Sequence, residues 1–194
     1  MCIRDRTTDA SGPIACVAAR ALQGVDAGGW FGPQFAGEPV PTLAQALACL
    51  ADLGLAANIE IKAESGRGTP AGARIAAMVA DLWPADLPAP LLSSFDADAL
   101  AAAAEAAPAI ERALIVDAVP PDWAAHLDRL GLRALHAALT PLDAETAAAV
   151  VDAGVALRVY TVNDPAIAER LFACGVESVF TDRPDRLLGR WPAA

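Results

Sequence analysis

The sequence predicts an α/β fold, specifically a (β/α)8 barrel of which about six units are present. Six short apolar segments alternate with helical patterns, at the spacing of about 20 to 33 residues that is typical of βα units in a parallel sheet. No Gly-x-Gly-x-x-Gly turn occurs, which disfavours a nucleotide-binding open sheet. Because a complete barrel needs eight units, we expect two to be missing on the amino-terminal side. Residues 1–194 are therefore predicted to form a single, incomplete barrel domain.

The segment before the first predicted strand is rich in glycine and proline. Residues 7–41 show no sustained periodicity, so we predict an ordered loop there, with one short helical turn near residues 18–22. Thr42 and Gln45 then have the spacing of a capping box, and Gly54 supplies a carboxyl-terminal stop. A helix between these signals is predicted to lead directly into the first strand.

Strands and helices then alternate to the end of the chain. The strands are predicted from short apolar or alternating runs, and the helices from amphipathic spacing with capping and stop residues. The predicted strands cover residues 58–62, 91–95, 113–116, 132–138, 155–162 and 178–181. The predicted helices cover an amphipathic segment around residues 75–82, then residues 96–107, 121–130, 143–153 and 165–173, and a short segment from residue 184.

The first predicted strand has two chemically different faces. Residues alternate with period two, so Ile59 and Ile61 share one face while Asn58, Glu60 and Lys62 project from the other. If helices cover the isoleucines, the polar row points toward something that attracts charge, such as a metal ion or an anionic substrate. The pattern is also compatible with an exposed antiparallel strand that has a solvated Glu/Lys face.

Polar residues recur where the predicted strands end. They are Glu60, Lys62, Ser93, Ser94, His136, Thr161, Asn163, Thr181 and Asp182. In (β/α)8 barrels the carboxyl ends of the strands carry the active site, so these residues are predicted to line its mouth. Asp182, which lies just before Arg183 and Pro184, is predicted to cap the last helix. His136 is compatible with either structural hydrogen bonding or site lining, and His126 is predicted to be a solvated surface residue.

Composition excludes several classes of protein. A net charge of -10 argues against a nucleic-acid binder, and no run of about 18 apolar residues predicts a membrane span. The four cysteines, at positions 2, 16, 49 and 174, are scattered without zinc-site spacing, so we expect reduced thiols in a cytoplasmic protein. We expect no signal peptide at the given start, because residues 1–6 contain two arginines and no apolar run follows.

Several motifs, in this order and spacing, resemble the glycerophosphodiester phosphodiesterases, especially the short bacterial cytosolic type. The resemblance extends from about Asp5 to Leu188. The matching segments are Arg6–Thr8, Ser11–Gly12, Val25–Phe31, Phe35–Glu38, Pro41–Leu43, Asn58–Lys62, Leu91–Phe95, Tyr160–Asn163 and Thr181–Asp182. Each segment alone is a weak signal, and the combination is specific.

The resemblance implies a (β/α)8 barrel of the phosphodiesterase type. It implies hydrolysis of glycerophosphodiesters to an alcohol and sn-glycerol 3-phosphate, with one divalent cation, Mg²⁺ or Ca²⁺. It assigns Glu60 as a metal ligand, because a hard cation takes carboxylate oxygens, and Lys62 as the cation that holds a phosphate oxygen. Ser93, Phe95, His136 and Asn163 are assigned to substrate binding. The expected partner is therefore a small-molecule phosphodiester.

Part of the family pattern is missing from this sequence. The family's His-Arg-Gly strand, Glu-x-Asp strand and His-Asp segment, which supply the acid–base histidines and two further metal-binding carboxylates, do not occur. We therefore interpret the sequence as an amino-terminally truncated product with a spurious leader at residues 1–4, and expect it to be inactive and poorly stable alone. Two other functions stay open: a non-catalytic binding module, and a different barrel enzyme, such as a lyase or aldolase that uses Lys62 as a Schiff-base nucleophile.

Overall fold

The computed structural model describes residues 3–190, which divide into two compact units. Within the described residues, the first unit comprises residues 3–55 and 82–87, and the second comprises residues 56–81 and 88–190. Residues 1 and 2 of the predicted leader, and Cys2 with them, lie outside the described residues. Cys16, Cys49 and Cys174 are exposed free thiols, as expected.

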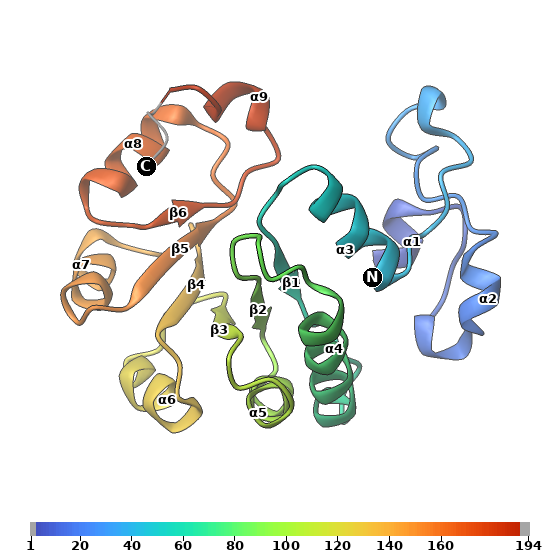
Figure 1. The fold of residues 1–194 in the computed structure, drawn as a ribbon. Helices are drawn as coiled ribbons and strands as arrows, with labels where there is room; N and C mark the ends of the chain where they lie inside the picture. Colours follow the sequence, from blue (N-terminus) through green and yellow to red (C-terminus); the bar gives the residue numbers. More distant parts are fainter. Residues whose placement is uncertain (1–2, 191–194) are drawn as a thin grey trace. The chain divides into compact units, whose positions relative to one another are not determined.

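The first unit contains short helical segments joined by loops (Figure 1). Its elements are α1 (Ile3–Thr7), η1 (Ile14–Cys16), α2 (Ala19–Leu22), η2 (Pro33–Phe35) and α3 (Leu43–Asp52). The predicted capping box of α3 is confirmed, because Thr42 Oγ1 accepts a hydrogen bond from the Gln45 amide and Gln45 Oε1 accepts one from the Thr42 amide. The loop predicted over residues 7–41 therefore contains three brief helical turns.

Asp26 organises the loop between α2 and η2. Its carboxylate accepts hydrogen bonds from the backbone amides of Gly28 and Gly29, each at 2.8 Å. Its own amide donates to the Asp9 carboxylate at 2.9 Å, and the Asp9 amide donates to the Asp26 carbonyl at 3.0 Å. Hydrogen bonds from the backbone amides of Gly29, Gly37 and Gly28 lower the pKa of the Asp26 carboxyl group. Gly28 cannot carry a side chain here, because a Cβ atom would overlap the Phe35 carbonyl.

The second unit is built on a parallel sheet of six strands in the order β1-β2-β3-β4-β5-β6. The strands are β1 (Asn58–Glu60), β2 (Leu91–Ser94), β3 (Glu111–Val116), β4 (Ala134–Ala138), β5 (Ala156–Tyr160) and β6 (Ser178–Val179). The helices are α4 (Gly68–Leu82), α5 (Ala97–Ala106), α6 (Trp123–Leu130), α7 (Ala144–Asp152), α8 (Pro165–Ala173) and α9 (Pro184–Leu187). This order confirms the predicted α/β fold, with the sheet curved as in part of a barrel.

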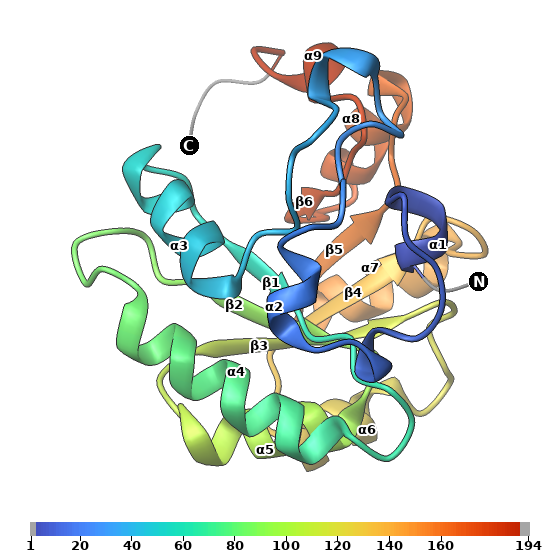
Figure 2. The same ribbon diagram turned by 90° about the vertical axis from the view of Figure 1, so that its right-hand side faces the viewer.

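The helices cover the outer side of the curved sheet, and the views in Figures 1 and 2 show α4 to α8 following it. The buried core joins Leu135 and Leu157 of the sheet to Leu127 of α6, Val150 of α7 and Ala168 of α8. Residues paired in register on neighbouring parallel strands point to the same side of the sheet. Because side chains alternate along each strand, the residues directly before and after these core leucines point to the opposite, inner face. That inner face carries the polar residues considered next.

All six predicted strands are present, with ends that differ by a few residues. β1 stops at Glu60, two residues earlier than predicted, although the Ile61 amide still donates to the Ser93 carbonyl at 2.7 Å. β3 starts at Glu111, two residues earlier than predicted, because its first residue pairs with Leu91 of β2. No described helix is both long and apolar enough to cross a membrane.

Candidate active site

Glu60 and Lys62 lie together at the carboxyl end of β1. Glu60 is the last residue of the strand, and Lys62 follows it on the same side. Lys62 Nζ is 3.0 Å from Glu60 Oε2, and the two side chains are 60% and 31% exposed, respectively. Ile61 between them is buried. The predicted alternation of this segment is therefore confirmed, and it presents an accessible cation and carboxylate at the edge of a parallel sheet.

The end of β2 fixes this edge from the neighbouring strand. Ser94 Oγ donates to the Ile61 carbonyl at 2.7 Å and accepts from the Asp96 amide at 3.0 Å, which ties the end of β1 to the start of α5. Ser93 is paired in register with Glu60 and therefore lies on the same face. Its side chain is completely buried, and its Oγ has no hydrogen-bond partner among the described residues.

Phe95 and Tyr160 form an aromatic pair, which we call the aromatic wall and which the sequence motifs did not predict. The half-exposed ring of Phe95 meets the ring of Tyr160 edge to face, with centroids 6.4 Å apart. Tyr160 ends β5, and its hydroxyl donates to the Val116 carbonyl at 2.9 Å and lies 3.2 Å from Asp117 Oδ1. Burial, then Asp117 and Glu60, raise the pKa of Tyr160 to about 12, so the phenol stays protonated at neutral pH.

Sequence reasoning missed Tyr160 and Asp117 as site residues. One signal was available for Asp117, because this carboxylate directly follows the apolar strand β3. For Tyr160 the signal was weaker, since an aromatic residue at a strand end is usually part of the core. The two residues are 43 positions apart in the sequence, so no local pattern predicts their contact.

Asn163 links the ends of β5 and β6. Its Oδ1 accepts from Thr181 Oγ1 and from the Asp182 amide, both at 2.9 Å, and its Nδ2 donates to Asp182 Oδ2 at 3.3 Å. The prediction that Asp182 caps α9 is wrong. The N-cap residue of α9 is Arg183, which makes no side-chain cap, and the Asp182 carboxylate is engaged with Asn163.

His136 lies away from the exposed edge. It is almost fully buried in β4, beside the ring of Phe180, and its Nε2 is 3.4 Å from Arg158 Nη1. Burial first, and then the Arg158 charge, lower the pKa of His136 to about 4, so it is neutral at pH 7. Arg158 also contacts Glu111, the first residue of β3, and Glu177, which directly precedes β6. We call Glu111, His136, Arg158 and Glu177 the inner cluster.

His126 lies on α6, with its Nε2 3.1 Å from the Asp122 carboxylate and a partly exposed side chain. This agrees with the surface position predicted for it. Neither histidine of the sequence therefore presents a free imidazole beside Glu60 and Lys62.

The described residues do not form a complete metal centre. Across residues 3–190, no group of three or more histidine, cysteine, aspartate or glutamate side chains gathers around one position. Glu60, at the end of β1, forms its ion pair with Lys62. The residues present thus supply part of a ligand set for a hard cation and do not fit an ion by themselves.

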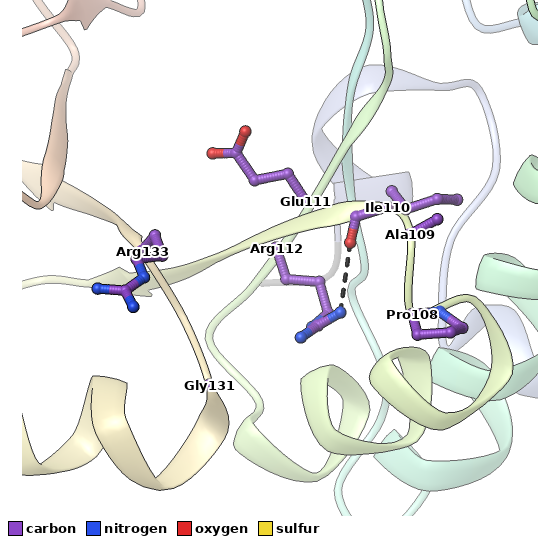
Figure 3. Close-up of a pocket in the computed structure, with 7 residues that line it drawn as sticks. All are labelled: Pro108, Ala109, Ile110, Glu111, Arg112, Gly131 and Arg133. Atoms are coloured by element: carbon purple, nitrogen blue, oxygen red, sulfur yellow. Dashed lines mark hydrogen bonds between the residues drawn. The ribbon is translucent and has the colours of Figure 1, made fainter.

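A cavity of about 220 Å³ lies at the opposite end of the sheet (Figure 3). It is lined by Pro108, Ala109, Ile110, Glu111, Arg112, Gly131 and Arg133, which precede or begin β3 and β4. Figure 3 shows that the guanidinium groups of Arg112 and Arg133 point in different directions, and Arg112 Nη1 donates to the Ile110 carbonyl at 3.3 Å. This cavity is remote from the strand ends that carry Glu60 and Lys62.

Comparisons with known proteins agree with the geometry. Residues 4–186 match the model of the glycerophosphoryl diester phosphodiesterase family. A glycerophosphodiester phosphodiesterase of Caldanaerobacter subterraneus subsp. tengcongensis is 30% identical over 186 residues, which cover 95% of this chain and 75% of the relative.

Solved structures give the same result. A phosphodiesterase of Oleispira antarctica in complex with the product sn-glycerol-3-phosphate is 32% identical, with a TM-score of 0.89 over 94% of this chain and 74% of that chain. A glycerophosphodiester phosphodiesterase of Agrobacterium tumefaciens is 26% identical, with a TM-score of 0.68 over 93% of this chain and 75% of that chain. The family and these relatives are phosphodiesterases. The chain belongs to the glycerophosphodiester phosphodiesterase family.

Proposed function

We propose that this chain binds glycerophosphodiesters at the carboxyl edge of its sheet, and that the reaction served by this site is hydrolysis to an alcohol and sn-glycerol 3-phosphate. The observation that carries the proposal is the exposed Lys62–Glu60 pair at the end of β1. An accessible ammonium at a strand end can hold a phosphate oxygen and offset the negative charge that develops during phosphoryl transfer. The Oleispira antarctica relative, which has a similar fold, binds sn-glycerol-3-phosphate.

Glu60 is assigned as one carboxylate ligand of a divalent cation, Mg²⁺ or Ca²⁺, in keeping with the general metal dependence of the family. Such an ion polarises the phosphoryl group when it is bound. Among the described residues, Glu60 does not belong to any group of three or more histidine, cysteine, aspartate or glutamate side chains that could hold such an ion. Ser93, Phe95 and Asn163 remain assigned to the substrate side of the site, where Phe95 and Asn163 are exposed and Ser93 is buried. For His136, which is buried beside Arg158, the structural alternative is favoured.

Proton transfer is not assigned to this chain's own histidines. His136 is buried beside Arg158, and His126 pairs with Asp122 on the surface of α6. The proposal therefore gives the chain phosphate binding and charge stabilisation. We expect hydrolysis to be slower than in family members that have acid–base histidines by about 10² to 10⁴, the usual contribution of a general acid or base.

The Schiff-base alternative is less favoured by the geometry. A lysine nucleophile has to be neutral, and enzymes achieve this by removing it from water or placing it beside another cation. Lys62 is instead 60% exposed and lies 3.0 Å from a carboxylate. The binding-module alternative predicts ligand binding without hydrolysis, whereas the proposal predicts slow hydrolysis, so an activity assay separates the two.

Calorimetric titration with sn-glycerol 3-phosphate, with and without Mg²⁺, tests the proposal. Wild-type chain and the Arg74→Met control, which removes an exposed cation on α4, are expected to bind the ligand equally. Lys62→Met is expected to weaken binding at least about tenfold, because a charge-assisted hydrogen bond is lost. An unchanged affinity in Lys62→Met, or no binding to wild type, would contradict the proposal. Release of sn-glycerol 3-phosphate from a glycerophosphodiester, measured in parallel, distinguishes slow hydrolysis from binding alone.

A further inference from the structure

Two arginines line the cavity of about 220 Å³ at the amino end of the sheet, which the proposed function does not use (Figure 3). Arg112 is the second residue of β3, and Arg133 directly precedes β4. We infer that this cavity, which we call the arginine cavity, binds a small phosphate-type anion between Arg112 and Arg133. The inference goes beyond the proposed function, because Lys62 lies at the opposite end of the sheet.

The backbone places the two arginines side by side. Ala113 and Ala134 are paired in register between β3 and β4, so Arg112 and Arg133, each one position earlier, are neighbours on one face of the sheet. The Arg133 carbonyl accepts a hydrogen bond from the Ala156 amide at 2.9 Å, which fixes the backbone at this point. Two like charges held at neighbouring positions repel each other, and an anion between them offsets the repulsion.

No carboxylate of the described chain supplies that negative charge. None of the salt bridges between described residues involves Arg112 or Arg133. Glu111 also lines the cavity, but in Figure 3 its side chain points away from Arg112, and its carboxylate lies 3.4 Å from Arg158 Nη2. In a protein with a net charge of -10, two neighbouring cations that lack a carboxylate partner form a local site of attraction for anions.

The Arg112 guanidinium also has a donor that its surroundings do not satisfy. Its Nη1 donates to the Ile110 carbonyl at 3.3 Å, while its buried Nε has no hydrogen-bond partner among the described residues. A guanidinium has five N–H donors, and leaving a buried donor unpaired costs free energy. Arg133 is exposed, and its guanidinium points away from that of Arg112, as repulsion between two like charges favours. We expect a bound anion to bring the two groups together.

The size and the donors of the arginine cavity favour a small oxyanion. Pockets for drug-sized ligands have volumes of about 300 to 1,000 Å³, and this cavity is smaller. The planar guanidinium group matches phosphate oxygens, to which it donates two parallel hydrogen bonds. The chemistry is shared by inorganic phosphate and by the phosphate group of a monoester, and the experiment distinguishes these two sources.

Calorimetric titration of inorganic phosphate into the Lys62→Met chain tests the inference, because this background removes the cation at the carboxyl edge. Sodium chloride of matched ionic strength serves as the reference, so that non-specific effects of salt cancel. We expect saturable binding in this background. Adding Arg133→Met is expected to weaken the affinity at least about tenfold, because charge-assisted hydrogen bonds are lost. Adding Arg129→Met, which removes an exposed cation from the last turn of α6, is expected to preserve it.

A second titration of the same chains with sn-glycerol 3-phosphate shows whether the cavity takes the free ion or a monoester. Absence of saturable binding of both ligands to Lys62→Met would overturn the inference. Equal affinities after the addition of Arg129→Met or Arg133→Met would overturn it too, and so would an Arg133→Met substitution that lowers stability in denaturant without weakening phosphate binding. A failure of the proposed function is seen separately, because Arg133→Met alone, which retains Lys62, would then not bind sn-glycerol 3-phosphate.

Discussion

Two regions of the inner face of the sheet use similar side chains in opposite ways. At the carboxyl edge, Lys62 is 60% exposed and has one carboxylate partner, Glu60. In the inner cluster, Arg158 is 13% exposed and contacts Glu111, Glu177 and the nitrogen of His136. The edge therefore retains donors that a ligand can use, while the donors of Arg158 are already occupied.

The contrast between Lys62 and Arg158 shows that a cluster of ionisable side chains is not by itself evidence of a binding site. An exposed ion pair contributes about 0–1 kcal/mol, so a ligand can replace it at little cost. Removing a largely buried cation that has several partners destabilises the fold, because the partner carboxylates are left without an opposite charge. The inner cluster is accordingly expected to affect stability, and the edge is expected to affect binding. The following measurements test that division.

The largest expected effect is the pH dependence that His136 gives to stability. Its folded pKa of about 4 is below the ordinary histidine pKa of 6.5, so between these two pH values the unfolded chain binds a proton that the folded chain does not. Stability therefore falls as the pH drops from about 6.5 to about 4, by on the order of 3 kcal/mol. Denaturant unfolding across this range measures the change.

The control for this prediction is the chain's other histidine. His126→Asn should retain the pH dependence, because His126 is partly exposed, whereas His136→Asn should flatten it. A slope that is the same in wild type and in His136→Asn would mean that other groups are responsible.

The next largest effect is expected for Arg158→Met. The substitution keeps an apolar stem but leaves Glu111 and Glu177 without their cation, and we expect a loss of about 2 kcal/mol. The figure is below that of a fully buried pair, because both carboxylates are half exposed. Arg129→Met on the exposed side of α6 is the control and should change little. Equal losses in the two variants would refute a special role for the inner cluster.

A smaller effect on stability is expected for Tyr160→Phe, because Tyr160 is partly exposed at the end of β5. The variant keeps the ring that meets Phe95 but removes the hydroxyl that donates to the Val116 carbonyl. We expect a loss of about 1 kcal/mol, the usual contribution of one hydrogen bond. Comparing the thermal unfolding of Tyr160→Phe with that of Asp117→Asn shows whether the Val116 carbonyl or the Asp117 carboxylate is the more important acceptor for the Tyr160 hydroxyl. A larger loss in Asp117→Asn would place the main bond at the carboxylate.

The smallest effect on stability is expected for Lys62→Met. Because its pair with Glu60 is exposed, we expect the free energy of unfolding to change by no more than about 0.5 kcal/mol. Denaturant unfolding checks this value with Arg74→Met as the reference. A loss comparable to that of Arg158→Met would show that the edge is structural after all.

The sequence was sufficient to predict the order of strands and helices and the two faces of β1. Both depend on local periodicity, and the alternation around Ile61 holds in the structure, where that side chain is buried. The aromatic wall depends on the register between separate strands, which no local pattern contains. The wrong assignment of Asp182 has a similar origin, because Asn163 on another strand end competes for its carboxylate.

The buried state of His136 was also not predictable from its position near a strand end. A histidine in such a place can face solvent or pack inward. Here the inward position is set by Arg158 on β5 and by Phe180, which follows β6. This arrangement brings together β4, β5 and the residue after β6, which are far apart in the sequence.

The most direct test of the central claim uses the fact that Lys62 is the only lysine of the sequence. Lysine labelled with ¹³C at the ε-carbon gives one NMR cross-peak from this side chain. On titration with sn-glycerol 3-phosphate, the account predicts a saturable shift of that cross-peak, with no comparable shift for glycerol. A cross-peak that does not move, or that moves equally with both ligands, would contradict the assignment of the phosphate site to the carboxyl edge of the sheet.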